Sequence, residues 1–333
     1  MYIYAGIDEA GYGPMFGPLL VGRSVFAIPR LEPGGDPPAL WQRLSKAVCR
    51  NLSSRNGRIA VNDSKKIYTP ASGLEHLERG VLAFAALAGH RPANVCQLLD
   101  ALSERTHHTL DHLPWYQPCE QRPWQPLPAA CTSGEIAVAR SMLAATASRI
   151  GVEVPDLAAS VVFEDRFNTM VARTRSKAAA SFTFVAGHLE AIWNRFGEHA
   201  PMVAVDRQSG RSHYRELLAL SFPQAQMRVL EESPLYSGYH LTQRGGAAQP
   251  ARAMTVSFEV EAEKRHMPVA LASMISKYVR ELMMARFQAW FAHHAPAVKP
   301  TAGYATDAQR FWREIEPMLP ALAIPAHHLR RIS

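Results

Sequence analysis

The sequence predicts an α/β fold in which a mixed central sheet is flanked by helices. Two apolar stretches with the character of strands, at 2–8 and 19–28, come first and are joined by a short turn. After them, stretches typical of strands and of helices alternate; in 74–88, for example, apolar residues recur at helical spacing. Strands followed by strand–helix alternation indicate a mixed sheet covered by helices.

The first two strands are expected to form an antiparallel hairpin. Residues 2–8 (YIYAGID) are apolar up to Asp8, Glu9 follows directly, and the glycine- and proline-rich segment 10–18 separates them from 19–28 (LLVGRSVFAI). So short a connection can join only antiparallel neighbours. Adjacent side chains on a strand point to opposite faces, so Asp8 and Glu9 can serve one site only if the strand ends there. The turn provides that end.

The remaining elements follow from apolar spacing and from turn residues. We expect further strands at 158–164, 202–206, 226–230 and 254–260. We expect helices at 74–88, 134–150, 176–196, 211–221, 268–292 and 305–318, and loops at 29–38 and 242–252.

Residues 106–130 are expected to be a long irregular connection. They contain five prolines, interleaved with Trp115, Tyr116 and Trp124. Proline fits neither a helix interior nor a central strand. We therefore interpret 90–150 as an insertion within one domain that spans 1–333, and expect its aromatic residues to pack it onto the core.

Composition restricts the classes of function. The chain of 333 residues has a formal net charge of +7, which favours polyanionic partners such as nucleic acid. Its four cysteines include no CxxC pair, so no zinc or redox motif is expected, and their scarcity fits the cytoplasm. No uncharged apolar run of about 18 residues occurs, so no membrane span is expected.

Three acids lie at the ends of predicted strands, where α/β folds place their functional sites. Asp8 and Glu9 end the first strand, and Asp206 ends the short apolar strand 202–206. Divalent cations such as Mg²⁺ need oxygen ligands, and carboxylates at strand ends supply them. For any single acid the alternative is a solvated loop carboxylate or a helix cap.

Five motifs, in order, resemble those of the ribonuclease HII (type 2 ribonuclease H) family. They are 6–14 (GIDEAGYGP), 62–66 (NDSKK), 203–206 (VAVD), 270–277 (ALASMISK), and Gly303, Tyr304 and Thr306 followed by His328, Arg330 and Arg331. The family patterns are GIDEAGRGP, NDSKKL, a strand ending in Asp, AAASILAK, GYxT and HRR. The resemblance covers the core but not 90–150, so the chain resembles a divergent and enlarged member.

The resemblance implies a ribonuclease H-like fold and hydrolysis of the RNA strand of RNA–DNA hybrids, which gives 5′-phosphate and 3′-hydroxyl ends. It implies two Mg²⁺ or Mn²⁺ ions, about 4 Å apart, held by carboxylates. Asp8, Glu9 and Asp206 match three catalytic ligands. The family's fourth acid, an Asp, lies ten residues before the serine matched by Ser273, which gives Glu263 here.

The fourth ligand has a rival. Val256, Phe258 and Val260 alternate in 254–260 and are expected to point inward, so that Glu259, Glu261 and Glu263 would share the other face. Glu261 is then the alternative to Glu263, and a purely polar strand face is a second alternative.

Substrate contacts are also implied by the resemblance. Gly11 and Gly13 match the family turn that approaches the RNA backbone, but Tyr12 replaces its Arg. Tyr304 matches the tyrosine that packs on the sugar at the RNA-to-DNA junction. Lys65 and Lys66 would hold phosphates, Ser273 would pack under the site, Lys277 would support an acid, and 296–333 would be a C-terminal substrate-contacting region.

The implied partner is an RNA–DNA hybrid or ribonucleotide-containing DNA, bound by a monomer without an obligate protein partner. Two alternatives stay open. One is a nuclease of the same fold with altered substrate, such as DNA or branched structures, which Tyr12 and Glu263 motivate. The other is a hybrid-binding protein without turnover, against which the intact Asp8–Glu9 pair argues.

Overall fold

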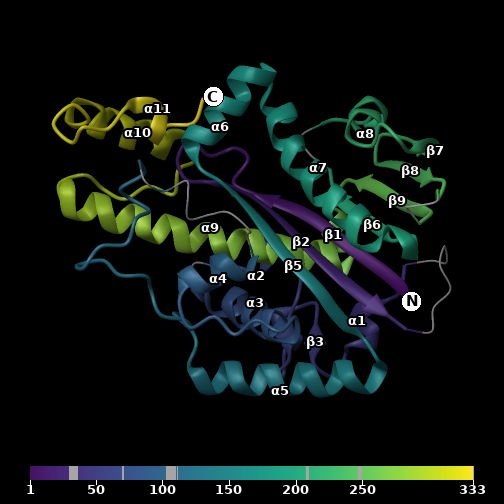
Figure 1. The fold of residues 1–333 in the computed structure, drawn as a ribbon. Helices are drawn as coiled ribbons and strands as arrows, with labels where there is room; N and C mark the ends of the chain where they lie inside the picture. The colour runs from purple at the N-terminus through teal and green to yellow at the C-terminus, as the bar shows by residue number, and fades with distance from the viewer. Residues whose placement is uncertain are drawn as a thin grey trace.

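The computed structural model describes residues 1–29, 37–69, 71–102, 110, 112–207, 210–246 and 250–332. Within them lies a seven-stranded sheet in the order β5-β2-β1-β6-β9-β8-β7 (Figure 1). Its strands are β1 (Tyr2–Ala10), β2 (Leu19–Ile28), β5 (Glu153–Val162), β6 (Met202–Asp206), β7 (Gln226–Glu232), β8 (Tyr236–Gln243) and β9 (Arg252–Glu259). A small parallel pair is formed by β3 (Val48–Cys49) and β4 (Ile59–Ala60).

The sheet is mixed, as the sequence predicts. β1 and β2 form the expected antiparallel hairpin, β5 is antiparallel to β2, and β9, β8 and β7 form an antiparallel meander. β6 runs parallel to both β1 and β9. Because β1 and β6 are parallel neighbours, Asp8, Glu9 and Asp206 emerge at the same edge of the sheet.

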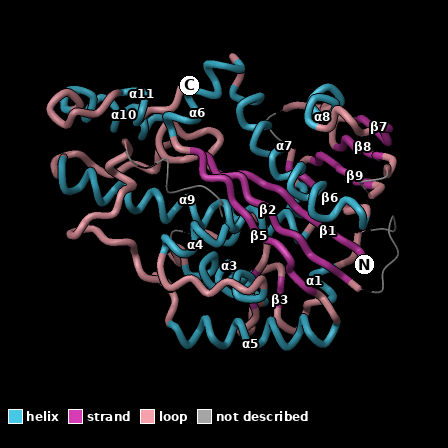
Figure 2. The backbone as a smooth tube through the Cα atoms, viewed as in Figure 1, coloured by secondary structure: helices cyan, strands magenta, loops and turns pink. Residues whose placement is uncertain are grey.

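Helices cover both faces of the sheet. α9 (Met267–His294) packs along β1 and β2 on one face, and α3 (Glu75–Leu87) packs on α9. α7 (Lys177–Phe196) covers the other face (Figures 1 and 2). The other helices are α1 (Leu40–Arg43), α2 (Ser64–Ile67), α4 (Val95–Leu102), α5 (Ser133–Ile150), α6 (Glu164–Thr174), α8 (Arg215–Ser221), α10 (Ala305–Ile315) and α11 (Ala326–Leu329). Short 3₁₀ helices include η1 (Leu52–Ser54), η3 (Gly197–His199), η4 (Ala262–Lys264) and η5 (Glu316–Met318).

The side chains of β1 divide between two apolar cores. Tyr2 and Tyr4 point into the core under α9, whereas Ile3, Ala5 and Ile7 point into the core under α7. A strand buried on both faces must be apolar at every position, which is why 2–8 forms a continuous apolar run. Among the described helices, none has the length and apolar character needed to cross a membrane.

The predicted strands and helices are all present, with shifted ends. β5 begins five residues before the expected start, and the expected helix at 305–318 is α10 followed by a 3₁₀ turn. No element was predicted at β8, α4 or α6, nor at the short elements α1, α2, α11, β3 and β4. The expected loop at 242–252 lies between β8, which ends at Gln243, and β9, which begins at Arg252, and its residues 247–249 lie outside the described residues. The expected loop at 29–38 lies mostly outside them as well.

Segment 90–150 packs on the α3–α9 side of the molecule. After α4, residues 103–109 and 111 lie outside the described part, and 112–132 contain no helix or strand (Figure 2). Trp115 and Tyr116 are fully buried and contact Phe287 of α9, so these two rings pack onto the core as expected. α5 then lies against α3.

A buried carboxylate ties this segment to the core. Glu78 of α3 accepts backbone hydrogen bonds from Ala129, Ala130 and Cys131, at 2.7, 2.6 and 2.7 Å. Tyr278 of α9 donates its hydroxyl to the same carboxylate at 2.7 Å. Four donors satisfy a charge that would otherwise be costly to bury.

Gly6 sets the distance between β1 and α9. A Cβ placed on Gly6 would lie 2.1 Å from the backbone nitrogen of Val269 and 2.2 Å from the carbonyl carbon of Pro268. We expect Gly6→Ala to lower the free energy of unfolding by about 3 kcal/mol, because backbone atoms cannot move aside as a side chain can. Urea unfolding followed by circular dichroism measures this change.

The control for Gly6→Ala is Gly187→Ala. Gly187 is exposed on α7, and a Cβ there would meet no atom within 4 Å. Alanine favours helix over glycine, so this variant should gain about 0.5–1 kcal/mol. Equal stability of the two variants would contradict the close approach of β1 and α9.

Candidate active site

A hollow of about 480 Å³ opens at the edge of the sheet where β1 and β6 end. We call it the acidic hollow, because Asp8, Glu9, Asp206 and Glu263 all line it. Its wall also contains the other predicted contact residues Gly11, Tyr12, Gly13, Lys65 and Tyr304, together with Ser273 and Lys277. Residues from widely separated parts of the chain therefore meet in one place.

Glu263 reaches the acidic hollow by a different path from the one expected. The predicted alternation through 263 is wrong, because β9 ends at Glu259 and Glu261 takes a left-handed conformation, with φ +53°. This turn leads into η4, which carries Glu263. The three glutamates consequently do not share one strand face.

The structure separates the roles of these glutamates. Glu259 is held by Ser257 at 2.7 Å, by Arg265 and by His266, and these hydrogen bonds bring its pKa down to about 2 despite burial. Glu261 is exposed and pairs with Lys264 at 2.5 Å. Glu263 is 8% exposed.

Asp8 and Asp206 lie in an excess of negative charge. Burial, followed by the charge of Asp206, raises the pKa of Asp8 well above its ordinary value. Burial, followed by the charge of Glu263, raises the pKa of Asp206 to about 7, and Glu9 adds to the effect. These mutual effects place the four carboxylates within electrostatic reach of one another.

Neutral donors hold the acids in place. The Glu9 backbone N–H donates to Asp8 Oδ1 at 2.6 Å. Ser273 on α9 adjoins the Asp8 carboxylate, while its hydroxyl donates to Ser64 Oγ at 3.0 Å. The Ala262 N–H donates to Asp206 Oδ1 at 3.0 Å. On the other face, Ser181 of α7 donates to Glu9 Oε2 at 3.3 Å.

Ser273 thus packs under the site as expected, whereas Ser181 was not anticipated. The only sequence sign of its role is a polar residue on the apolar side of α7. Neither serine adds charge, so both orient carboxylates without neutralising them.

The donor set suits a hard divalent cation in type and charge. Six carboxylates line the hollow, those of the four predicted acids together with Asp63 and the rival Glu261, and the cations on its wall are Lys65, Arg207 and Lys277, of which Lys277 is paired with Glu281 at 2.7 Å. Across the described residues, however, no three Asp, Glu, His or Cys side chains are close enough to hold a metal ion as they stand. A bound cation would offset the negative charge that, after burial, raises the pKa of Asp206.

The residues expected to contact substrate differ in the space around them and in their exposure. Gly11 has φ +83°, and a Cβ on it would lie 2.5 Å from Arg280 Nε, whereas Gly13 is open. Tyr12 is half-buried against the core under α7. Tyr304 is 44% exposed.

The lysines also differ from one another. Lys65 lines the acidic hollow, but exposed Lys66 is not among its lining residues. Lys277, expected to support an acid, pairs with Glu281 and lies 4.7 Å from the centre of the Tyr68 ring.

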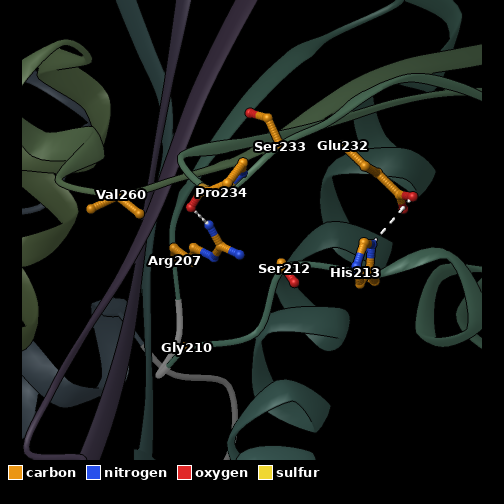
Figure 3. Close-up of a pocket in the computed structure, with 8 residues that line it drawn as sticks. All are labelled: Arg207, Gly210, Ser212, His213, Glu232, Ser233, Pro234 and Val260. Carbon is orange, nitrogen blue, oxygen red and sulfur yellow. Dashed lines mark hydrogen bonds and ion pairs between the residues drawn. The ribbon is translucent and has the colours of Figure 1, made fainter.

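A second pocket, of about 560 Å³, adjoins the acidic hollow and shares Arg207 and Val260 with it (Figure 3). Arg207 donates to the carbonyl of Pro234, and His213 lies 3.3 Å from Glu232. No sequence motif predicts this pocket, because its walls come from separate segments of the chain.

The sequence matches no protein-family model and no curated protein. The chain is similar to three solved ribonucleases H over 98% of its length. Ribonuclease HII of Archaeoglobus fulgidus, in a complex with PCNA, is 16% identical, with a TM-score of 0.41 and 93% of that chain covered. Ribonuclease H2 of Pyrococcus horikoshii OT3 is 14% identical, with a TM-score of 0.39 and 92% covered. RNase H3 of Aquifex aeolicus is 14% identical, with a TM-score of 0.39 and 70% covered.

Proposed function

We propose that this protein is a metal-dependent endonuclease that cuts the RNA strand of RNA–DNA hybrids. The observation that carries the proposal is the meeting of Asp8, Glu9, Asp206 and Glu263 in one hollow. Asp8, Glu9 and Asp206 match three catalytic acids of the ribonuclease HII motifs, and Glu263 stands where those motifs have an Asp. Four chance acids from three distant segments would rarely share a site.

The carboxylates would bind Mg²⁺ or Mn²⁺. When bound, such ions would supply activation of a water and stabilisation of the leaving 3′ oxygen, and the products would carry 5′-phosphate and 3′-hydroxyl ends. Asp8 and Asp206, at the ends of parallel strands, would be the most rigid ligands. Glu9 and Glu263 would complete the set, with Ser181 and Ser273 orienting Glu9 and Asp8.

Recognition of the substrate would come from the rim of the acidic hollow. The ring of Tyr304 is exposed enough to pack on a ribose, and the open backbone at Gly13 leaves room for a phosphate. Lys65 would add a point charge. Contacts to the 2′-hydroxyl distinguish RNA from DNA, so this rim would determine substrate preference.

A shifted substrate range is the second candidate, and Tyr12 supports it. Where the family has an arginine, this chain has a ring that packs partly on the core. A phosphate contact is therefore missing at that position. This favours long hybrids, or DNA, over duplexes with a single ribonucleotide.

Cleavage of labelled duplexes tests the proposal. A full RNA–DNA hybrid, a DNA duplex with one ribonucleotide, and an all-DNA duplex would each be incubated with Mg²⁺, Mn²⁺ or EDTA. We expect the hybrid to be cut with either metal and to be stable in EDTA. Cleavage of the all-DNA duplex alone would favour the shifted nuclease, and binding of the hybrid without cleavage would favour a non-catalytic binding protein.

A further inference from the structure

Three charged side chains are buried together behind the turn that borders the acidic hollow. Arg280 of α9 and Arg331, two residues after α11, are each 1% exposed, and Glu164, the first residue of α6, is fully buried. Burying guanidinium and carboxylate groups is costly, and ion pairs repay that cost only with good geometry. The burial of all three charged groups behind this turn therefore indicates a specific role for them.

Arg331 holds the first half of the turn. Its Nη2 donates to the carbonyls of Gly11 and Pro14. Its backbone N–H donates to the carbonyl of Met15 at 2.9 Å. The two residues that flank Tyr12 and Gly13 are thus both fixed by one side chain.

Arg280 and Glu164 hold the second half. Arg280 Nη2 donates to the carbonyl of Phe16 at 3.1 Å, and the Gly17 N–H donates to Glu164 Oε1 at 2.9 Å. Tyr116 donates its hydroxyl to the same Glu164 oxygen at 2.8 Å. From 11 to 17 the turn is therefore anchored to buried charges.

The cluster of Arg280, Arg331 and Glu164 also contacts Tyr304, the other residue expected to bind substrate. The Arg280 guanidinium carbon lies 5.2 Å from the centre of the Tyr304 ring. The Met15 N–H donates to the carbonyl of Gly303 at 2.7 Å, and a Cβ on Gly303 would lie 2.5 Å from the Phe16 oxygen. The turn and Tyr304 are thereby fixed relative to one another.

Several polar atoms of the cluster lack hydrogen-bond partners, unlike those of a purely structural ion pair. Arg331 Nε and Nη1, Arg280 Nε and Glu164 Oε2 are buried without hydrogen-bond partners in the described part of the chain. Burial raises the pKa of Glu164 to about 7 and lowers that of Arg331 to about 10. Apolar residues would pack here at lower cost, so stability alone does not account for the two arginines.

A third buried arginine, Arg286, lies on α9 and has a structural role. Arg286 donates from Nε to the Tyr116 carbonyl at 3.0 Å, from Nη1 to that of Pro123 at 3.0 Å, and from Nη2 to that of Gln117 at 2.7 Å. It ties 116–123 to the helix. None of these groups lines the acidic hollow.

We infer that Arg280 and Arg331 are positioning residues that fix the turn at 11–13 relative to Tyr304, and so set the affinity for the hybrid. The inference rests on the proposed function for its substrate. The arginines touch main-chain carbonyls and a ring rather than the acids. Their loss should therefore weaken substrate binding more than the chemical step.

The test compares Arg331→Met with Arg286→Met, since each variant removes one buried guanidinium that holds carbonyls. We expect Arg331→Met to raise KM for the hybrid about tenfold, with kcat changed less than about threefold. Arg331→Lys, which keeps one donor, should recover part of the affinity. Arg286→Met should lower the melting temperature and leave KM unchanged.

Hydrogen exchange provides a readout that needs no substrate. In Arg331→Met, backbone amides in 12–17 and 302–304 should exchange faster, while in Arg286→Met they should exchange as in wild type. Unchanged exchange, or an equal rise of KM in both variants, would overturn the inference. If wild type cleaved no duplex, the proposed function would fail, and exchange would still decide whether the two arginines position the turn.

Discussion

Asp8→Asn is expected to lower hybrid cleavage by at least about 10³-fold with either Mg²⁺ or Mn²⁺. Asp8 is buried, and its backbone is fixed both by pairing with β2 and by Ser276, which donates to its carbonyl at 3.2 Å. Asparagine keeps the shape and one oxygen but removes the charge that would bind a cation. Single-turnover cleavage of a labelled hybrid measures the loss.

The same variant should be more stable than wild type in EDTA. Burial and Asp206 raise the pKa of Asp8, which means that its charge is unfavourable in the folded protein. Removing that charge should raise the free energy of unfolding at pH 8. Adding Mn²⁺ should then stabilise wild type more than the variant. Loss of activity together with loss of stability in EDTA would instead indicate a damaged fold, and full activity would remove Asp8 from the site.

Glu263→Gln is expected to lower cleavage by about 10²-fold, whereas Glu261→Gln should leave it within about twofold. Glu263 is buried and contributes to the raised pKa of Asp206, while Glu261 is exposed and paired with Lys264. The two variants make the same chemical change two residues apart. Each would be assayed with the hybrid at saturating Mg²⁺.

Glu263→Asp provides the matched control, because it restores the residue found in the family pattern. It keeps the charge and shortens the side chain by one methylene, so we expect partial activity and a changed ratio of Mg²⁺- to Mn²⁺-dependent rates. An inactive Glu261→Gln beside an active Glu263→Gln would show that the fourth acid is Glu261.

The sequence predicts the inner strands better than the turns between them. β2 and β6 have the expected ends, because their buried runs are apolar and are closed by glycine, proline or an acid. The left-handed turn at Glu261 could not be predicted, since glutamate rarely takes this conformation and no glycine or asparagine marks it. The alternation therefore holds only to Glu259, the last residue of β9, and not through 263.

The candidate site could be predicted where a residue and its sequence neighbours indicate its role. Asp8 and Asp206 each follow an apolar run, and this pattern can be recognised in the sequence alone. Arg280 gave no such sign, and the HRR-like motif that contains Arg331 did not indicate its burial, because buried arginines and solvated arginines look alike in a sequence. Ser181 was missed for a similar reason: a hydroxyl matters only once the fold has placed a carboxylate beside it.

The contact between Arg331 and Gly11 joins residues that are 320 positions apart. During synthesis on the ribosome, Asp8 and Glu9 emerge early, whereas Arg331, which supports the turn after them, is added much later. A nascent chain can therefore form its first hairpin long before the turn at 11–13 and the acidic hollow beside it take their final shape.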